Sequence, residues 1–177
     1  MARMLARDPA ALAFFSRPIA CLALFVGLAT PACATAPARS TPSPTAEADV
    51  ARVLDDWHDA AAKADEERYF GHIAEGGVFL GTDMTERWEK PAFRAYAHPR
   101  FASGKAWSFR ATRRDLTVRG DLAWFDEELD TPNLGPSRGS GVLVRDAKNE
   151  WKVVQYNLSV PIPTERFADV KKLIGGK

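Results

Sequence analysis

Three strand-like runs in the last third of the chain constrain the fold more than any other feature. They span residues 124–127, 138–143 and 151–161. Turn-forming residues separate the runs, and carboxylates, an arginine and an asparagine interrupt them at positions that can face inward. A polar side chain inside a sheet core is either hydrogen-bonded structure or part of a pocket lining. The pattern therefore predicts a sheet with polar groups on its covered face.

Helical periodicity precedes these strands. Asp65 can cap a second, short helix that reaches Ile73. Pro91 can begin a third helix, which we expect to stop before Pro99. The apolar residues of the first helix recur on one face: Val50, Val53, Leu54, Trp57, Ala61 and Ala64.

The strand pattern completes the predicted fold. We expect strands at residues 78–80, 105–119 (bulged near 113–114), 122–130, 139–145 and 151–160. Thr164 can cap a short C-terminal helix that ends at Ile174. Helices segregated from an antiparallel sheet make an α+β architecture. We therefore expect a cone, in which a curved antiparallel sheet wraps two to three N-terminal helices around a cavity.

The first 34 residues are typical of a signal peptide. A basic lead precedes an apolar run at residues 19–28, and Ala32, Cys33 and Ala34 supply small residues for cleavage. The run is shorter than the roughly 20 residues of a membrane-spanning helix. We expect a periplasmic or secreted protein cleaved after Ala34. The alternatives are a buried N-terminal helix, a cut after Ala36, and a membrane-anchored lipoprotein with Cys33 as its acylated first residue.

Composition supports export and argues against a nucleic-acid-binding protein. The only two cysteines, Cys21 and Cys33, lie in or beside the predicted signal peptide. A chain cut after Ala34 therefore has no thiol that could form a wrong disulfide in an oxidising compartment. Removing three arginines and one aspartate leaves 21 basic and 22 acidic residues, a net charge of −1, which argues against a nucleic-acid partner. Residues 35–45 are rich in Pro, Ser and Thr and predict a linker, which leaves 46–177 as one domain.

Six short motifs along the domain carry a family resemblance: Trp57-His58, Gly81-Thr82-Asp83, Glu86-Arg87-Trp88, Trp124-Phe125-Asp126-Glu127, Arg138-Gly139-Ser140-Gly141 and Tyr156-Asn157-Leu158. Together they resemble the SnoaL-like branch of the nuclear transport factor 2-like superfamily over roughly residues 50–163. The resemblance implies a cone-shaped α+β fold with an apolar cavity, commonly dimeric, so a homodimer is expected. The superfamily includes isomerases, dehydratases, polyketide cyclases, hydrolases and binding modules, so the fold does not settle the activity.

Three ionisable residues are candidate catalytic groups. Asp126 and Glu127 are adjacent on a strand and must face opposite ways; Glu127 lies on the more apolar face, so we expect it inward. Arg138 is its expected partner. One of Asp83 and Glu86 could act as a carboxylate base; otherwise Asp83 caps a turn and Glu86 pairs with Arg87 or Arg138. His58 could act as a base or be a hydrogen-bonded structural histidine.

Other side chains are candidates for contacting a ligand, and metal sites are not indicated. The three histidines lie on three different elements without metal-ligand spacing, and no phosphate-binding loop is present. We therefore expect no cofactor. The candidate ligand-binding residues are Trp57, Tyr69, Glu86, Trp88, Trp107, Arg138, Tyr156 and Asn157.

Two functions remain compatible with the sequence. One is an exported domain that binds a small, largely apolar molecule. The alternative is an isomerase, dehydratase or cyclase-type enzyme that uses a cavity carboxylate or His58 as general base. A base beside a hydrogen-bond donor in the cavity would favour the enzyme.

Overall fold

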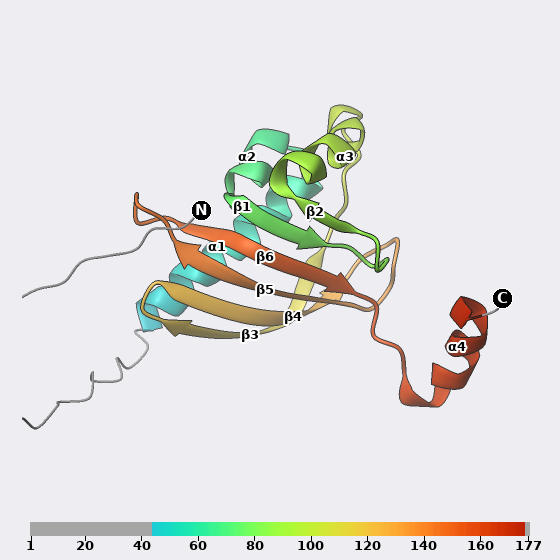
Figure 1. Ribbon diagram of the computed structural model, residues 1–177. Helices are drawn as coiled ribbons and strands as arrows, with labels where there is room; N and C mark the ends of the chain where they lie inside the picture. The colour runs from blue at the N-terminus through green and yellow to red at the C-terminus, as the bar shows by residue number, and fades with distance from the viewer. Residues whose placement is uncertain (1–43, 176–177) are drawn as a thin grey trace, which may run out of the picture. The chain divides into compact units, whose positions relative to one another are not determined.

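The computed structural model describes residues 44–175, which belong to one compact unit, Arg39–Lys177. The predicted signal peptide lies outside the described residues, as does the predicted linker up to residue 43. In the first half of this unit, helices α1 (Pro44–Ala62) and α2 (Glu66–Gly71) are followed by strands β1 (Ile73–Leu80) and β2 (Arg87–Glu89) and then by helix α3 (Lys90–Ala102) (Figure 1). In the described part of the chain, no helix is long and apolar enough to cross a membrane.

The second half of the unit is the expected meander. Its strands are β3 (Arg110–Arg119), β4 (Leu122–Asp130), β5 (Ser137–Arg145) and β6 (Trp151–Ser159), which follow one another across the sheet. The complete strand order is β2-β1-β6-β5-β4-β3. The predicted α+β class is confirmed. The sheet differs from a wholly antiparallel one at a single junction, where β1 runs parallel to β6.

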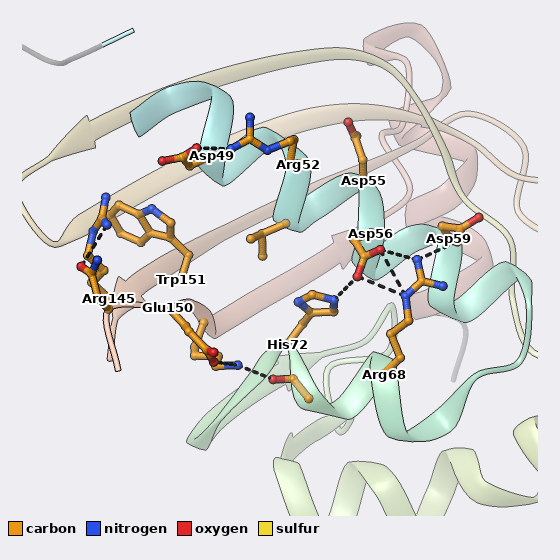
Figure 2. A pocket seen from close by; sticks show the side chains of 14 residues that line it. Asp49, Arg52, Asp55, Asp56, Asp59, Arg68, His72, Arg145, Glu150 and Trp151 are labelled. Atoms are coloured by element: carbon orange, nitrogen blue, oxygen red, sulfur yellow. Dashed lines mark hydrogen bonds and ion pairs between the residues drawn. The ribbon is translucent and has the colours of Figure 1, made fainter. Parts of the chain in front are cut away.

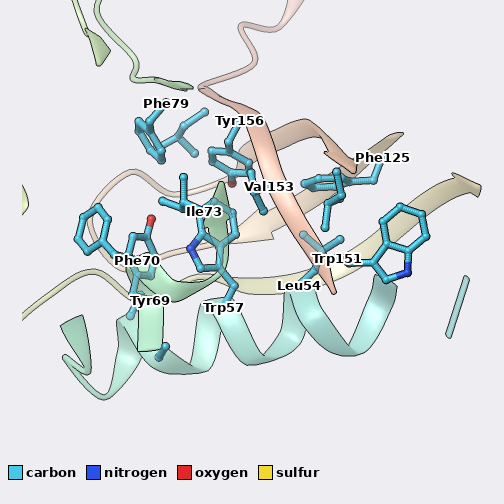
Figure 3. Close-up of a cluster of buried hydrophobic side chains, with 14 of the residues drawn as sticks. Leu54, Trp57, Tyr69, Phe70, Ile73, Phe79, Phe125, Trp151, Val153 and Tyr156 are labelled. Atoms are coloured by element: carbon cyan, nitrogen blue, oxygen red, sulfur yellow. The ribbon is translucent and has the colours of Figure 1, made fainter. Parts of the chain in front are cut away.

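Helix α1 covers one face of the sheet because its apolar stripe is continuous. Val50, Leu54 and Trp57 are completely buried. Figure 3 shows Leu54 and Trp57 directed from α1 toward β6, the strand that carries Val153 and Tyr156. The core therefore lies between α1 and the inner face of the meander.

Helix α2 begins where the sequence predicts. The Asp65 carboxylate accepts a hydrogen bond from the backbone N–H of Arg68 at 3.1 Å, which caps the helix. The predicted end at Ile73 was wrong, since α2 ends at Gly71. Ile73 instead begins β1, where it pairs with Val153 of β6.

The predicted end of α3 before Pro99 was also wrong. The helix continues through Pro99 to Ala102. A proline inside a helix removes a hydrogen bond, but here the extra turn buries Phe101, whose ring lies 5.2 Å from that of Tyr69 and 5.4 Å from that of Trp107. The backbone N–H of Ser103 still donates to the carbonyl of Pro99 at 3.2 Å. Aromatic packing therefore offsets the lost backbone bond.

Two other boundaries differ from the sequence prediction. Residues 105–109 precede β3 without joining it, because Trp107 and Phe109 turn toward the core and pack against it. At the C-terminus, Thr164 does not cap a helix. It begins a 3-10 turn, η1 (Thr164–Arg166), which leads into α4 (Phe167–Gly175) and has no side-chain cap.

Candidate functional site

A buried carboxylate marks the inner face of the meander. Along β4 the odd-numbered residues are buried and the even-numbered ones exposed, so Glu127 faces the core with 1% of its surface exposed, as expected. Nε2 of His58, on α1, lies 2.7 Å from Oε1 of Glu127. Arg114, on β3, donates from Nε to Oε2 of Glu127 at 2.9 Å. The carboxylate is therefore held from two sides.

The charge state of Glu127 follows from these contacts. Burial alone would raise the pKa of Glu127. The hydrogen bond with His58 and the charges of His58 and Arg114 together lower it by more than burial raises it, so the pKa lies below its ordinary value. Arg114 also donates to Asp55 at 2.8 Å and to the carbonyl of Ala51 at 3.2 Å. Glu127 is thus an ionised carboxylate fixed in a structural ion-pair network.

The predicted partner of Glu127, Arg138, was wrong. Gly139 is the β5 residue directly opposite Glu127, and Arg138 therefore alternates to the other face, where it is exposed opposite Glu128. The absence of a side chain at Gly139 is required by its neighbours. A Cβ there would collide with the Tyr156 hydroxyl and lie 3.0 Å from Oε1 of Glu127. Glycine therefore leaves room for both buried side chains.

The aromatic residues around this network belong to the core. Trp57 stacks on Tyr69, with ring centroids 5.2 Å apart, and meets Tyr156 edge-on at 4.9 Å. Burial, followed by the charge of Glu127, raises the pKa of Tyr156 well above its ordinary value. The Trp57 indole N–H and the Tyr156 hydroxyl are buried without a hydrogen-bond partner in the described part of the chain. These predicted ligand-binding residues contact one another, and they line neither of the two pockets described below.

Phe109 separates the buried His58–Glu127 pair from a pocket lined by aromatic residues. The Phe109 ring contacts the His58 imidazole edge-on, with centroids 6.0 Å apart, and also lines the pocket. The pocket has a volume of about 230 Å³. We call it the aromatic pocket, and its lining residues are Phe79, Gly81, Thr82, Glu86, Trp88, Phe93, Tyr96, Arg100, Trp107, Phe109, Thr131, Asn133, Leu134 and Leu158.

Stacked rings form the walls of the aromatic pocket. Phe93, from α3, stacks on Phe79 at 4.0 Å, on Trp88 at 5.8 Å and on Trp107 at 5.8 Å between ring centroids. Trp88 in turn stacks on Tyr96 at 4.5 Å. Four elements or loops therefore contribute one continuous aromatic surface.

The pocket contains one carboxylate, that of Glu86. This half-buried side chain folds against Gly81, where a Cβ would collide with its carboxylate oxygen. Its one described hydrogen bond is from the backbone N–H of Asp83 at 3.3 Å, and no ion pair joins it to another of residues 44–175. Glu86 is therefore the acidic group available to a ligand.

Asp83 and Asn157 lie away from the pocket lining. The exposed Asp83 carboxylate accepts hydrogen bonds from the backbone N–H of Thr85 at 2.8 Å and from its hydroxyl at 2.6 Å, so it caps a turn. Asn157 lies half-buried on β6 next to Leu158, which does line the pocket. Of the eight predicted ligand-binding residues, Glu86, Trp88 and Trp107 line the aromatic pocket.

Sequence reasoning missed most of the remaining lining. Phe109 alternates with Trp107 in an extended segment, which is a signal that could have placed both on one face. Phe93 and Tyr96 are three residues apart on α3, a spacing that puts them on one side of the helix. Arg100 follows Tyr96 by four residues and continues the same side of α3. Leu134 carries no comparable signal, since tertiary packing alone brings it to the pocket.

The second pocket is a polar groove lined by residues of α1, α2 and the turn between β5 and β6 (Figure 2). Its volume is about 1080 Å³, and its charged groups take part in ion pairs, some of them with residues outside the lining. Asp56 pairs with Arg68, and its carboxylate lies 2.6 Å from Nε2 of His72. No group of three or more potential metal ligands occurs in the part of the chain that the structure describes. The charges of this groove are therefore already held in ion pairs.

Comparison with solved structures supports the architecture. An NTF2-like protein of unknown function from Pseudomonas putida KT2440 is similar with a TM-score of 0.61 and 17% identity, over 71% of this chain and 93% of that chain. A cystatin-like fold protein of unknown function from Nostoc punctiforme gives a TM-score of 0.60 at 13% identity, over 71% and 97%. A proposed dehydratase of the NTF2-like family from Streptomyces avermitilis gives 0.55 at 17%, over 67% and 98%.

Sequence comparison assigns the family. The search of curated proteins gives no match. The family model described as "SnoaL-like domain" matches residues 50–163, which span α1 to the end of the sheet. The chain therefore belongs to the SnoaL-like domain family.

Proposed function

We propose that this SnoaL-like domain binds a small, largely apolar molecule in the aromatic pocket. The observation that carries the proposal is the contrast between two carboxylates. Glu127 is enclosed by His58 and Arg114, whereas Glu86 lines the pocket with no ion-pair partner in the described residues. A concave aromatic surface with one or two available polar groups is typical of a small-molecule site.

An NMR titration tests this proposal. Benzyl alcohol added to the ¹⁵N-labelled full chain should shift the indole N–H signals of Trp88 and Trp107, which line the pocket. Thr82→Trp should weaken this binding strongly, because Thr82 is an exposed residue of the lining and a larger side chain there fills the pocket. Met84→Trp is the matched control, since Met84 is 97% exposed on the same loop and outside the lining. Equal binding by both variants would refute the pocket as the site.

An enzyme is the second candidate, and the unpaired Glu86 carboxylate is the observation that favours it. Isomerisation, dehydration and cyclisation can each begin with removal of a proton from a carbon next to a carbonyl, which a carboxylate can accept. The proposed dehydratase from Streptomyces avermitilis shares the fold. His58 is less accessible as a base, because it contacts Glu127 on one side and Phe109 on the other.

Proton exchange distinguishes the enzyme from the binding module. An enzyme should catalyse deuterium incorporation from D₂O into an aromatic ketone such as 2-tetralone, and Glu86→Gln should remove that catalysis. A binding module should bind the ketone and leave the exchange at its uncatalysed rate.

We also propose that the domain acts outside the cytoplasm, in the periplasm or after secretion. Support comes from the basic lead, the apolar run and the small residues at Ala32–Ala34, all outside the described residues. Mass spectrometry of protein from the native host tests it. A chain that starts at Thr35 supports cleavage, a lipid-modified Cys33 supports the anchored alternative, and a cytoplasmic chain with intact Met1 refutes export.

A homodimer is a further part of the proposal. Support comes from the family resemblance and from two apolar side chains exposed on the outer face of β4, Leu122 and Trp124. Light scattering coupled to size-exclusion chromatography should give twice the mass of the mature chain, and the mass of one chain would refute it.

A further inference from the structure

The loop after β1 positions the only carboxylate of the aromatic pocket. The backbone N–H of Gly81 donates to the carbonyl of Glu86 at 2.8 Å, and the N–H of Glu86 donates to the carbonyl of Asp83 at 2.9 Å. These bonds close the loop and turn the Glu86 side chain back over Gly81, where only a residue without a Cβ leaves the space free. The carboxylate is therefore held at the pocket by its own backbone.

The aromatic walls add to the negative character of the site. The face of an aromatic ring is electrostatically negative, and a cation near it is attracted by about 0.5 to 2 kcal/mol. Trp88, Phe93 and Trp107 stack with interplanar angles of about 20°. Such walls beside a carboxylate favour a positively charged group over an anion.

The second charged group of the lining, Arg100, does not cancel this preference. Its guanidinium lies over the ring of Tyr96, 5.1 Å from the centroid, and its side chain is exposed. No ion pair joins Arg100 to Glu86 in the described residues, so the carboxylate stays available. Thr82 and Asn133 line the same pocket and offer further acceptor oxygens to an N–H group.

From this arrangement we propose that the aromatic pocket selects small organic cations, in which an amine is attached to an aromatic or apolar body. The ammonium group contacts the Glu86 carboxylate and the body lies among the rings of Trp88, Phe93 and Trp107. This inference rests on the proposed small-molecule pocket and adds the charge of its ligand.

Three probes of similar size and different charge test the inference. Benzylamine, benzyl alcohol and benzoate share a phenyl ring and are a cation, a neutral molecule and an anion at pH 7. Titrated into the full chain by NMR, benzylamine should bind about tenfold more tightly than benzyl alcohol, a difference of about 1.4 kcal/mol. Benzoate should bind more weakly than benzyl alcohol.

Matched variants assign the selectivity to one residue. Glu86→Gln keeps the size of the side chain and should lower benzylamine affinity to that of benzyl alcohol, with benzyl alcohol itself unchanged. Glu89→Gln removes the same charge three positions along the chain from an exposed residue outside the lining, and should preserve the tenfold preference.

The outcomes separate this inference from the proposed function. Equal binding of benzylamine and benzyl alcohol, or tighter binding of benzoate, overturns the cation preference while the small-molecule pocket stands. Loss of the preference in Glu89→Gln as well as in Glu86→Gln overturns the assignment to the pocket carboxylate. No shift of the Trp88 and Trp107 signals with any of the three probes overturns both proposals.

Discussion

The Nε2 atom of His58 and the Oε1 atom of Glu127 lie 2.7 Å apart, although 69 positions separate the two residues in the chain. Arg114 occupies the other oxygen of the same carboxylate and reaches Asp55 of α1 as well. Charged side chains between α1 and the sheet thereby join α1 to β3 and β4. A buried charge that loses its partner destabilises a fold strongly, because its desolvation is no longer offset.

Arg114→Met is predicted to destabilise the protein by about 3 kcal/mol. The change leaves the Glu127 carboxylate, whose side chain is 0% exposed, with His58 alone. Glu127→Gln should be milder, because Arg114 keeps its bonds to Asp55 and the carbonyl of Ala51. Urea unfolding of the two single variants and the double variant should give a double-mutant cycle in which the double variant loses less than the sum.

Arg138→Met is the matched control for this cycle. Arg138 is exposed on the outer face of β5, so its removal should change the free energy of unfolding by no more than about 0.5 kcal/mol. Additive effects of the Glu127 and Arg114 changes would contradict a coupled network.

The inward direction of Glu127 could be predicted from the sequence, and its partner could not. Period-two alternation along β4 is a local property, and it separates Glu127 from Asp126 without further information. The partner depends on the register between strands. A register shift between Ala111 and Arg113 sets Arg114 opposite Glu127, and a pattern within one strand does not contain that register.

The same distinction applies to the fold and to the aromatic pocket. The meander strand β4 and the cap at Asp65 follow from local signals and were placed correctly. β2 is only three residues long, Arg87–Glu89, and forms because β1 offers it an edge. Trp88 and Trp107 are among the ligand-binding residues expected from the sequence, but the pocket between them depends on how α3 packs on β1.

Acid should weaken the fold partly through Asp56. Hydrogen bonds from Arg68 hold the pKa of Asp56 at about 2, below its ordinary value of 3.8. Between these two values the unfolded chain binds more protons than the folded one at this position, so stability falls as the pH is lowered through this window. Asp56→Asn should therefore flatten the decline in the free energy of unfolding between pH 4 and pH 2. A decline as steep as that of the unchanged protein would contradict the assignment.

Gly139→Ala is predicted to cost about 2 kcal/mol of stability. The added Cβ would collide with the Tyr156 hydroxyl and lie 2.9 Å from its Cζ atom, and both Tyr156 and Glu127 are buried too firmly to move aside. Gly76→Ala is the control, because a Cβ at Gly76 meets nothing within 4 Å. Thermal unfolding should separate the two variants, and equal melting temperatures would show that the space opposite Glu127 is not needed.

Gly81→Ala should change both ligand selectivity and stability. A Cβ at Gly81 would collide with Oε2 of Glu86, which can swing away, but it would also lie 2.9 Å from the Glu86 Cβ, which moves only with the backbone of the loop. We therefore expect a loss of about 2 kcal/mol in the free energy of unfolding, together with loss of the preference for benzylamine over benzyl alcohol. In the Glu86→Gln background the same change should have no further effect on that preference, because no carboxylate is left to displace. A Gly81→Ala variant that still prefers the cation tenfold would show that the pocket does not depend on where Gly81 holds the Glu86 side chain.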